Sequence, residues 1–347
     1  MIDLNNLEEI KKIDPADTYK TTSLANEQAK AAWEQVKNLD IPSLKGQVKS
    51  VIFCGMGASI YGALVLKAIK GDTLPFPIEV ISDYHLPTYA DESTLVVLTS
   101  YSGTTEEVLS CAQEAKGKKT KMLVLTKGGP LAEFARENNV PAYIFDGKFN
   151  LSSTPRLGNG YTVIGLLGLF KKLEIIDISD EEMKKAFDYL DTQLEDIKHE
   201  ALKESEIFVN RIPIVIAAEH LAGNGQILRN QFNETSKAFS ALYLVPDLNH
   251  HLMEGLQFPK DSKLYFLVLN SHLYSPKIKK RMELTVEVIK QNGHEVINSF
   301  PMGKTKIEEF LETLTYGSWL TLYLGLRYNQ NPAINPWVDW FKAQLSK

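Results

Sequence analysis

The sequence has few cysteines, no excess of positive charge and no long apolar segment. Its 2 cysteines are too few for a disulfide framework and indicate core residues in a reducing compartment. The formal net charge of -5 leaves no basic surface for nucleic acid, so we expect no nucleic-acid partner. The most apolar helical segment, 163–170, is too short to span a bilayer, and the first residues are polar and charged, unlike a signal peptide. We therefore predict a cytoplasmic protein with no membrane partner.

The length and composition indicate a globular protein with more than one domain. The chain has 347 residues, of which 44% are hydrophobic and 23% charged. That balance is typical of globular proteins, and the length suits two domains of ordinary size.

Short apolar segments alternate with helical segments in both halves of the chain. After a mostly helical stretch at 1–47, we expect strands at 51–54, 78–82, 95–99, 122–126 and 142–145, and in the second half at 214–218, 242–245, 264–269 and 295–299. We expect the principal helices at 28–39, 55–69, 104–116, 130–138, 160–173, 179–206, 226–239, 276–291 and 304–328. Continuous apolar strands separated by helices are typical of parallel sheets covered on both faces.

The predicted fold class is therefore α/β, with two doubly wound parallel-sheet domains of flavodoxin-like type that face each other across a cleft. The N-terminal domain is predicted at 1–150, a linker and helix at 151–178, and the C-terminal domain at 179–347.

Residues 98–107, LTSYSGTTEE, join a predicted strand to a predicted helix. A helix that begins there has free N–H groups, to which Ser100, Ser102 and Thr105 add hydroxyls. The loop lacks the lysine of a nucleotide-binding P-loop, so it favours a small phosphorylated metabolite such as a sugar phosphate. The alternative is an ordinary helix cap completed by Glu106 or Glu107, and the loop alone does not decide between them.

A second strand-to-helix turn has the sequence Gly55-Met56-Gly57-Ala58-Ser59. The third glycine and the acidic residue of a dinucleotide-binding fingerprint are missing, so we do not expect NAD. The turn instead predicts close approach of a ligand at Gly55 and Gly57, with Ser59 near the start of the helix. The alternative is a tight turn without a ligand.

Four further residues each allow a functional and a structural interpretation. Arg156 lies in the predicted linker, where it would stabilise an oxyanion or simply be solvated. Glu234 is a candidate general base or the partner of Lys237 in a surface ion pair. His250 is a candidate acid or base, without the spacing of a metal site. Lys342 would reach back into the cleft or extend its charge to water.

The order of these motifs resembles the bifunctional phosphoglucose/phosphomannose isomerases of the sugar isomerase (SIS) superfamily, nearly from end to end. The resemblance rests on the following segments: Lys12-Ile13-Asp14-Pro15, Gln28, GMGAS at 55–59, SYSGTT at 100–105, Pro155-Arg156, Asn233-Glu234 with Lys237, Asn249-His250 and the lysine near the C-terminus.

The resemblance implies interconversion of glucose 6-phosphate or mannose 6-phosphate with fructose 6-phosphate through a cis-enediol, as in glycolysis and gluconeogenesis. It implies a homodimer that needs no cofactor and no metal. The residues that match the family's phosphate-binding positions are Ser59, Ser100, Ser102 and Thr105. By the same resemblance, Glu234 is the base between C1 and C2, Arg156 lies near these carbons, and His250 of a partner subunit acts with Lys342 in ring opening.

The chain departs from the family pattern at a few positions. Ala58 and Thr104 replace a glycine and an asparagine, and His251-Leu252 follows His250 where the family has asparagine-glutamate. Two alternative functions remain at this stage. One is an amino-sugar phosphate isomerase or deaminase with the same loop, and the other is a phosphosugar-binding protein without turnover.

Overall fold

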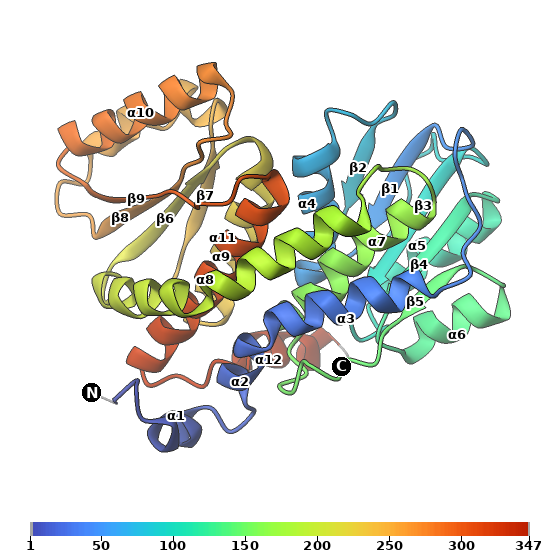
Figure 1. The fold of residues 1–347 in the computed structure, drawn as a ribbon, viewed down its shortest axis with the longest axis horizontal. Helices are drawn as coiled ribbons and strands as arrows, with labels where there is room; N and C mark the ends of the chain where they lie inside the picture. Colours follow the sequence, from blue (N-terminus) through green and yellow to red (C-terminus); the bar gives the residue numbers. More distant parts are fainter. Residues whose placement is uncertain (1–2, 346–347) are drawn as a thin grey trace.

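The structure is a computed structural model that describes residues 3–345, and it contains two separate parallel β-sheets (Figure 1). The first sheet has the order β2-β1-β3-β4-β5 and the second the order β7-β6-β8-β9. The strands are β1 (Ser50–Cys54), β2 (Ile78–Ile81), β3 (Thr94–Ser100), β4 (Lys121–Thr126), β5 (Ala142–Ile144), β6 (Ile212–Ala217), β7 (Ala241–Leu244), β8 (Leu264–Leu269) and β9 (Glu295–Ser299). The predicted α/β class with parallel sheets is confirmed.

Helices connect the strands and extend the chain at both ends. They are α1 (Leu7–Ile13), α2 (Thr18–Ser23), α3 (Ala25–Lys37), α4 (Tyr61–Lys70), α5 (Glu106–Gly117), α6 (Gly129–Glu137), α7 (Gly165–Lys172), α8 (Asp180–Ile207), α9 (Ala222–Glu234), α10 (Pro276–Gln291), α11 (Lys306–Arg327) and α12 (Pro336–Leu345). Among these helices of residues 3–345, none combines the length and the apolar character needed to cross a membrane.

Both faces of the first sheet are covered by helices, as the continuous apolar strands predict. All residues of β3 are buried, and alternate side chains enter two different cores. Phe53 and Val97 belong to the core that includes residues of α3, α4 and α7. Cys54 and Leu98 belong to the core under α5 and α6. The first sheet is therefore the middle layer of a three-layer unit.

Each sheet has one place where the strand order reverses direction. In the first sheet this is between β1 and β3, and in the second it is between β6 and β8. Because the strands are parallel, their carboxyl ends lie at the same edge, and ligands of such folds bind in the crevice at the reversal. The turn at 55–59 follows β1 and the loop at 100–105 follows β3, so both predicted ligand segments lie at this position.

Helix α9 differs from the expected helix at 226–239, because it begins and ends earlier. Two positions near its start hold glycine, and neighbouring elements approach both of them closely. A Cβ on Gly223 would lie 3.0 Å from Val65 of α4, and one on Gly225 would lie 2.8 Å from Leu242 of β7. Two more expected helices begin five or six residues late, because a short 3-10 helix (Gly57–Ile60) precedes α4 and a short π-helix (Gly160–Ile164) precedes α7. The remaining expected strands and helices agree with the structure to within about three residues, a normal uncertainty for boundaries. Because α9 ends earlier than expected, Glu234 is its last residue.

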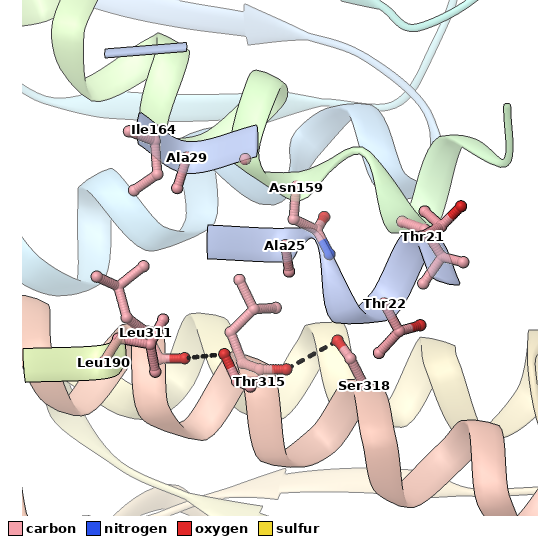
Figure 2. Close-up of a pocket in the computed structure, with 13 residues that line it drawn as sticks. Thr21, Thr22, Ala25, Ala29, Asn159, Ile164, Leu190, Leu311, Thr315 and Ser318 are labelled. Carbon is pink, nitrogen blue, oxygen red and sulfur yellow. Dashed lines mark hydrogen bonds between the residues drawn. The ribbon is translucent and has the colours of Figure 1, made fainter. Parts of the chain in front are cut away.

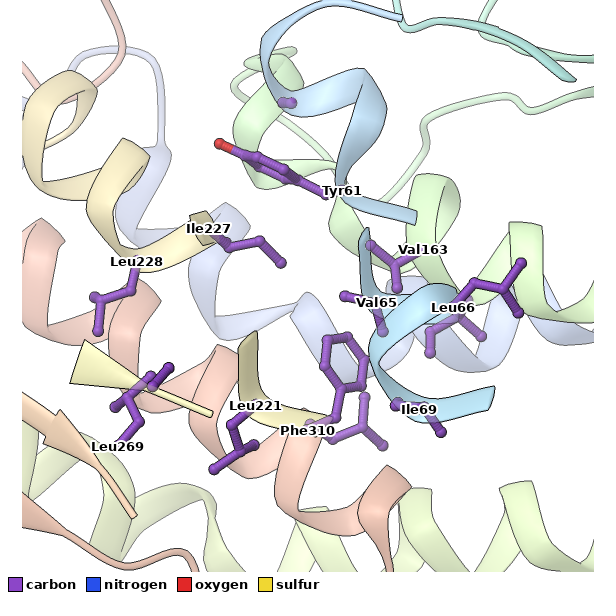
Figure 3. Packing of buried hydrophobic residues seen from close by; sticks show 14 of the residues in the cluster. Tyr61, Val65, Leu66, Ile69, Val163, Leu221, Ile227, Leu228, Leu269 and Phe310 are labelled. Carbon is purple, nitrogen blue, oxygen red and sulfur yellow. The ribbon is translucent and has the colours of Figure 1, made fainter. Parts of the chain in front are cut away.

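Contacts between α4 and α9 join the two halves of the molecule. Figure 3 shows Tyr61 and Val65 of α4 facing Ile227 and Leu228 of α9, with Phe310 of α11 beside them. These side chains are almost completely buried, and burying one apolar side chain of this size stabilises a fold by roughly 1.5–3 kcal/mol. This packing holds the two sheets in a fixed relation.

The chain at 150–160, where the expected linker begins, is packed into the protein. Asn150, Thr154, Arg156 and Leu157 are all buried, and a short 3-10 helix, η2 (Pro155–Leu157), forms within it. The segment therefore contributes to the interior instead of bridging domains through solvent. The predicted domain boundaries at 150 and 178 stay a prediction.

Candidate functional site

The loop after β3 folds back on itself through its own hydroxyl groups. The hydroxyls of Ser100 and Thr105 share a hydrogen bond of 2.7 Å, and those of Ser102 and Thr104 share one of 2.8 Å. Thr105 is the N-cap of α5, but its side chain makes no capping hydrogen bond. The alternative of an ordinary capped helix is therefore not what the structure shows. The first N–H groups of α5 remain available, with the polarity that favours an anion.

Gly103 fixes the shape of this loop. Its backbone has a φ of +75°, and a Cβ there would lie 1.8 Å from the carbonyl oxygen of Gly128. Its own N–H donates to Ser100 Oγ at 3.0 Å. Only glycine fits such a position without displacing backbone atoms. The loop is therefore pressed against the chain that follows β4.

The turn after β1 lies directly against this loop. The N–H of Tyr101 donates to Ser59 Oγ at 3.2 Å, and a Cβ on Gly55 would lie 3.1 Å from the carbonyl oxygen of Thr99. Gly57 has a φ of +55° and open space beside it. Ser59 belongs to a 3-10 helix, η1 (Gly57–Ile60), that leads into α4. The four predicted phosphate-binding residues are thus close together at the reversal point of the first sheet, and we call this group (Ser59, Ser100, Ser102 and Thr105) the hydroxyl cradle.

Arg156 is held in place from several sides. Its segment η2 contacts η1, and its side chain is only 2% exposed. Nε donates to Thr235 Oγ1 at 3.0 Å, and Nη2 donates to the carbonyl oxygens of Pro332 and Ala333, the latter at 3.2 Å. Burial lowers the pKa of Arg156, and the negative charge of Glu234 opposes that effect. The alternative of a solvated linker arginine is therefore wrong.

Glu234 is the ionic partner of Arg156. Its Oε2 lies 3.5 Å from Arg156 Nη1, and its side chain is 33% exposed, so solvent reaches it. Asn335 Nδ2 also donates to Oε2, at 3.3 Å. Lys237, which the sequence suggested as the ionic partner of Glu234, instead donates from Nζ to the carbonyl oxygen of Glu234. A carboxylate that is accessible on one side and paired with a buried arginine on the other suits a base that acts next to a developing anion.

Tyr61 is a residue of this site that sequence reasoning missed. It is the first residue of α4, two positions after the GMGAS turn, and it is completely buried. Burial raises the pKa of Tyr61, and the negative charge of Glu234 raises it further. The phenol therefore stays protonated near neutral pH. Its place directly after the turn predicted to approach a ligand is the sequence signal that could have identified it.

His250 lies apart from this group within one chain. It is exposed at the end of a 3-10 helix, η5 (Asp247–His250), which follows the edge strand β7. The neighbouring Asn249 is fastened to α10, because its Nδ2 donates to Thr285 Oγ1 at 2.8 Å and its Oδ1 accepts from Arg281 at 3.1 Å. Within residues 3–345, no hydrogen bond or ion pair joins His250 to Glu234 or Arg156.

Lys342 lies on α12, a helix with no buried residues. The helix follows the segment 332–335, which contacts Arg156 and Glu234 directly. The start of α12 is therefore close to the candidate site, although the helix itself is at the surface (Figure 1).

A small cavity lies beside the Arg156 segment, and it is too small for a sugar. Its volume is about 20 Å³, which is room for one water molecule. Figure 2 shows its lining, with Thr21 and Ala25 from the N-terminal helices, Asn159 from the segment after η2, and Thr315 and Ser318 from α11. It therefore belongs to the packing between these elements and does not form a substrate pocket.

Comparison with known proteins gives consistent matches along most of the chain. Residues 46–143 match the SIS domain, and residues 197–345 match the bacterial phospho-glucose isomerase C-terminal SIS domain. A bifunctional phosphoglucose/phosphomannose isomerase of Caldicellulosiruptor bescii is 28% identical over 334 residues, covering 92% of this chain and 96% of that protein. The same-named protein of Aquifex aeolicus is 27% identical over 317 residues, covering 91% and 94%.

A solved structure shows the same fold. A hypothetical protein of Thermus thermophilus superposes with a TM-score of 0.72 at 18% identity, covering 97% of this chain and 91% of that one.

Proposed function

Because the chain belongs to the bifunctional phosphoglucose/phosphomannose isomerase family of SIS-domain proteins, we propose that it interconverts glucose 6-phosphate or mannose 6-phosphate with fructose 6-phosphate. The observation that carries the proposal is the ion pair between the buried Arg156 and the accessible Glu234, whose Nη1 and Oε2 atoms lie 3.5 Å apart. Arg156 lies on η2, which contacts η1, the segment that contains Ser59 of the hydroxyl cradle. Phosphate recognition and acid–base chemistry are thereby neighbours.

The isomerisation step requires one base that serves C1 and C2, together with a donor for the enediolate oxygen. Glu234 takes the proton from one carbon and returns it to the other through a cis-enediol. Arg156 Nη1 is the guanidinium nitrogen that faces this carboxylate, and at 3.5 Å it is farther away than a normal hydrogen bond. The two N–H groups of Nη1 therefore remain available to stabilise the developing oxyanion. Burial strengthens that interaction, because few water molecules compete.

The hydroxyl cradle holds the 6-phosphate in this proposal. Hydroxyl and backbone N–H groups at the start of α5 donate to the phosphate oxygens, and the helix dipole favours the negative charge. On binding, phosphate oxygens replace the hydroxyl-to-hydroxyl contacts of Ser100 with Thr105 and of Ser102 with Thr104.

Ring opening is assigned to His250 and Lys342, with the histidine supplied by a second copy in a homodimer. The exposed position of His250 at the edge of the second sheet supports a role toward another chain. Large apolar side chains of one helix, α12, also lie at the surface, among them Trp337, 83% exposed, and Trp340, 59% exposed. A contiguous exposed apolar surface is typical of a protein interface.

His251, the departure next to His250, is engaged within its own turn. Its Nε2 lies 3.3 Å from Asp247 Oδ2. Both histidines are exposed, and because His251 is engaged with Asp247, the proposal assigns ring opening to His250. The cytoplasmic location and the absence of a cofactor remain part of the proposal.

The test is formation of fructose 6-phosphate from glucose 6-phosphate and from mannose 6-phosphate, followed by NMR in D₂O to detect deuterium at C2. Glu234→Gln keeps the shape and removes the base, so kcat should fall by about 10²-fold or more. Glu181→Gln, at an exposed position on α8, is the matched control and should behave as the wild type. Binding of hexose 6-phosphates without any turnover would instead indicate a phosphosugar-binding protein.

A further inference from the structure

A short segment between α11 and α12 crosses the end of α9 and contacts the candidate site. We call residues 331–335 the strap. Three successive carbonyl oxygens of the strap accept hydrogen bonds from two cationic side chains. Arg156 Nη2 donates to Pro332 and Ala333, and Lys237 Nζ donates to Ile334 at 2.6 Å. The last residue of the strap, Asn335, donates to Glu234 Oε2 at 3.3 Å.

Lys237 connects the strap to the end of α9. Its Nζ also donates to the carbonyl oxygen of Glu234, so one ammonium group bridges the helix end and the strap. Its backbone has a φ of +59°, a left-handed conformation that is unfavourable for a residue with a Cβ. A glycine would adopt this conformation more easily but would supply no ammonium group. The strained backbone at Lys237 therefore indicates that its side chain has a function that glycine could not provide.

We propose that Lys237 is a positioning residue for Glu234: its ammonium group fastens the strap to the end of α9 and thereby keeps the Asn335 amide on the Glu234 carboxylate. The role rests on the proposed isomerase function, in which Glu234 is the base. Lys237 acts through the strap and not on the substrate. The same connection also sets the start of α12, which carries Lys342.

The charged groups around Lys237 make this connection sensitive to pH. Burial and the positive charge of Arg156 on η2 lower the pKa of Lys237 to about 8, while Glu234 on α9 opposes the shift. Below that pH the donor is an ammonium, and above it a neutral amine that makes weaker hydrogen bonds. The hold on the strap therefore weakens as the pH rises through about 8, and kcat should fall with it.

The test compares Lys237→Met, Lys237→Arg and the control Lys277→Met in the full-length protein. Lys277 is exposed on α10, away from the site. Kinetics with both hexose 6-phosphates across pH 6.5–9.5 are combined with hydrogen–deuterium exchange of 331–345. We expect Lys237→Met to lower kcat by about tenfold or more, with little change in KM, and to speed exchange in the strap. Lys237→Arg should retain kcat at neutral pH and lose the alkaline decline, because arginine stays charged.

Three results would overturn the proposal. Wild-type kcat in Lys237→Met at neutral pH would show that the strap does not position Glu234. Unchanged exchange at 331–345 would show that Lys237 does not hold the strap. An alkaline decline in Lys237→Arg identical to that of the wild type would assign the decline to another group. If the wild type and Lys277→Met make no fructose 6-phosphate, the proposed function itself fails, and the exchange data still decide whether Lys237 holds the strap.

Discussion

Replacing Gly103 by alanine should destabilise the protein and weaken phosphate binding together. A left-handed backbone costs an L-residue about 1–2 kcal/mol, and φ here is +75°. The new Cβ would also lie 1.8 Å from the carbonyl oxygen of Gly128, and overpacking of this kind costs about 1–3 kcal/mol. The sum is roughly 2–5 kcal/mol. Urea unfolding measures it as a lower midpoint at an unchanged slope, and calorimetry measures the loss of hexose 6-phosphate affinity.

Gly46→Ala is the matched control for the backbone contribution. Gly46 has a similar φ of +70°, but nothing lies within 4 Å of its Cβ position. This variant should therefore lose only about 1–2 kcal/mol and bind hexose 6-phosphates normally. If both variants lose the same stability, the close contact with Gly128 carries no cost and the loop is not pressed against that chain. If Gly103→Ala is destabilised but binds with full affinity, the shape of the loop does not matter for the phosphate.

Two further experiments test the roles proposed for individual site residues. Ser102→Ala and Thr105→Ala should each weaken hexose 6-phosphate binding by about 1–3 kcal/mol, because a donor to a charged group is lost. Binding of unphosphorylated glucose should not change in these variants, and the control Ser110→Ala on α5 should bind hexose 6-phosphates as the wild type does. Equal affinity of the wild type for glucose and glucose 6-phosphate would refute the role of the hydroxyl cradle in binding phosphate. His250→Ala and Glu234→Ala chains, each inactive alone, should regain roughly a quarter of wild-type activity after co-refolding, as expected for random exchange in a two-fold dimer. Mixed dimers without activity would show that the two residues act within one chain or that His250 has no catalytic role.

The parts of the fold that sequence predicts well are those with local causes. The apolar strands, the loop at 100–105 and the turn at 55–59 are all defined by neighbouring residues, and the structure contains them at the predicted places. The hydroxyl cradle also follows from local sequence once the strand order brings β1 and β3 together. Parallel strands place their carboxyl ends at one edge, so the two loops meet by topology.

The parts that sequence could not predict depend on distant contacts. From the local sequence, Arg156 could equally be a solvated linker residue, because the carbonyl groups that it binds lie 176 and 177 positions later in the chain. Helix α9 ends shortly before the left-handed Lys237, whose ammonium is held by the strap 97 positions later in the chain. Asn335 has no local feature that would place it on Glu234. Side chains whose partners are far apart in sequence leave no periodic or spacing signal.

The packing of α4 on α9 fixes how the two halves of the proposed site lie relative to each other. Ser59 lies just before α4, and Glu234 is the last residue of α9, so each helix carries one functional group at an end. Gly223 lets the helices approach until its Cβ position is 3.0 Å from Val65, and the apolar contacts of Figure 3 hold them there. In the proposed mechanism, the hydroxyl cradle, which includes Ser59 just before α4, binds the phosphate of a sugar whose reacting carbons must reach Glu234 on α9. The separation between phosphate and base is therefore set by a rigid helix contact, and the peripheral elements need only supply the groups for ring opening.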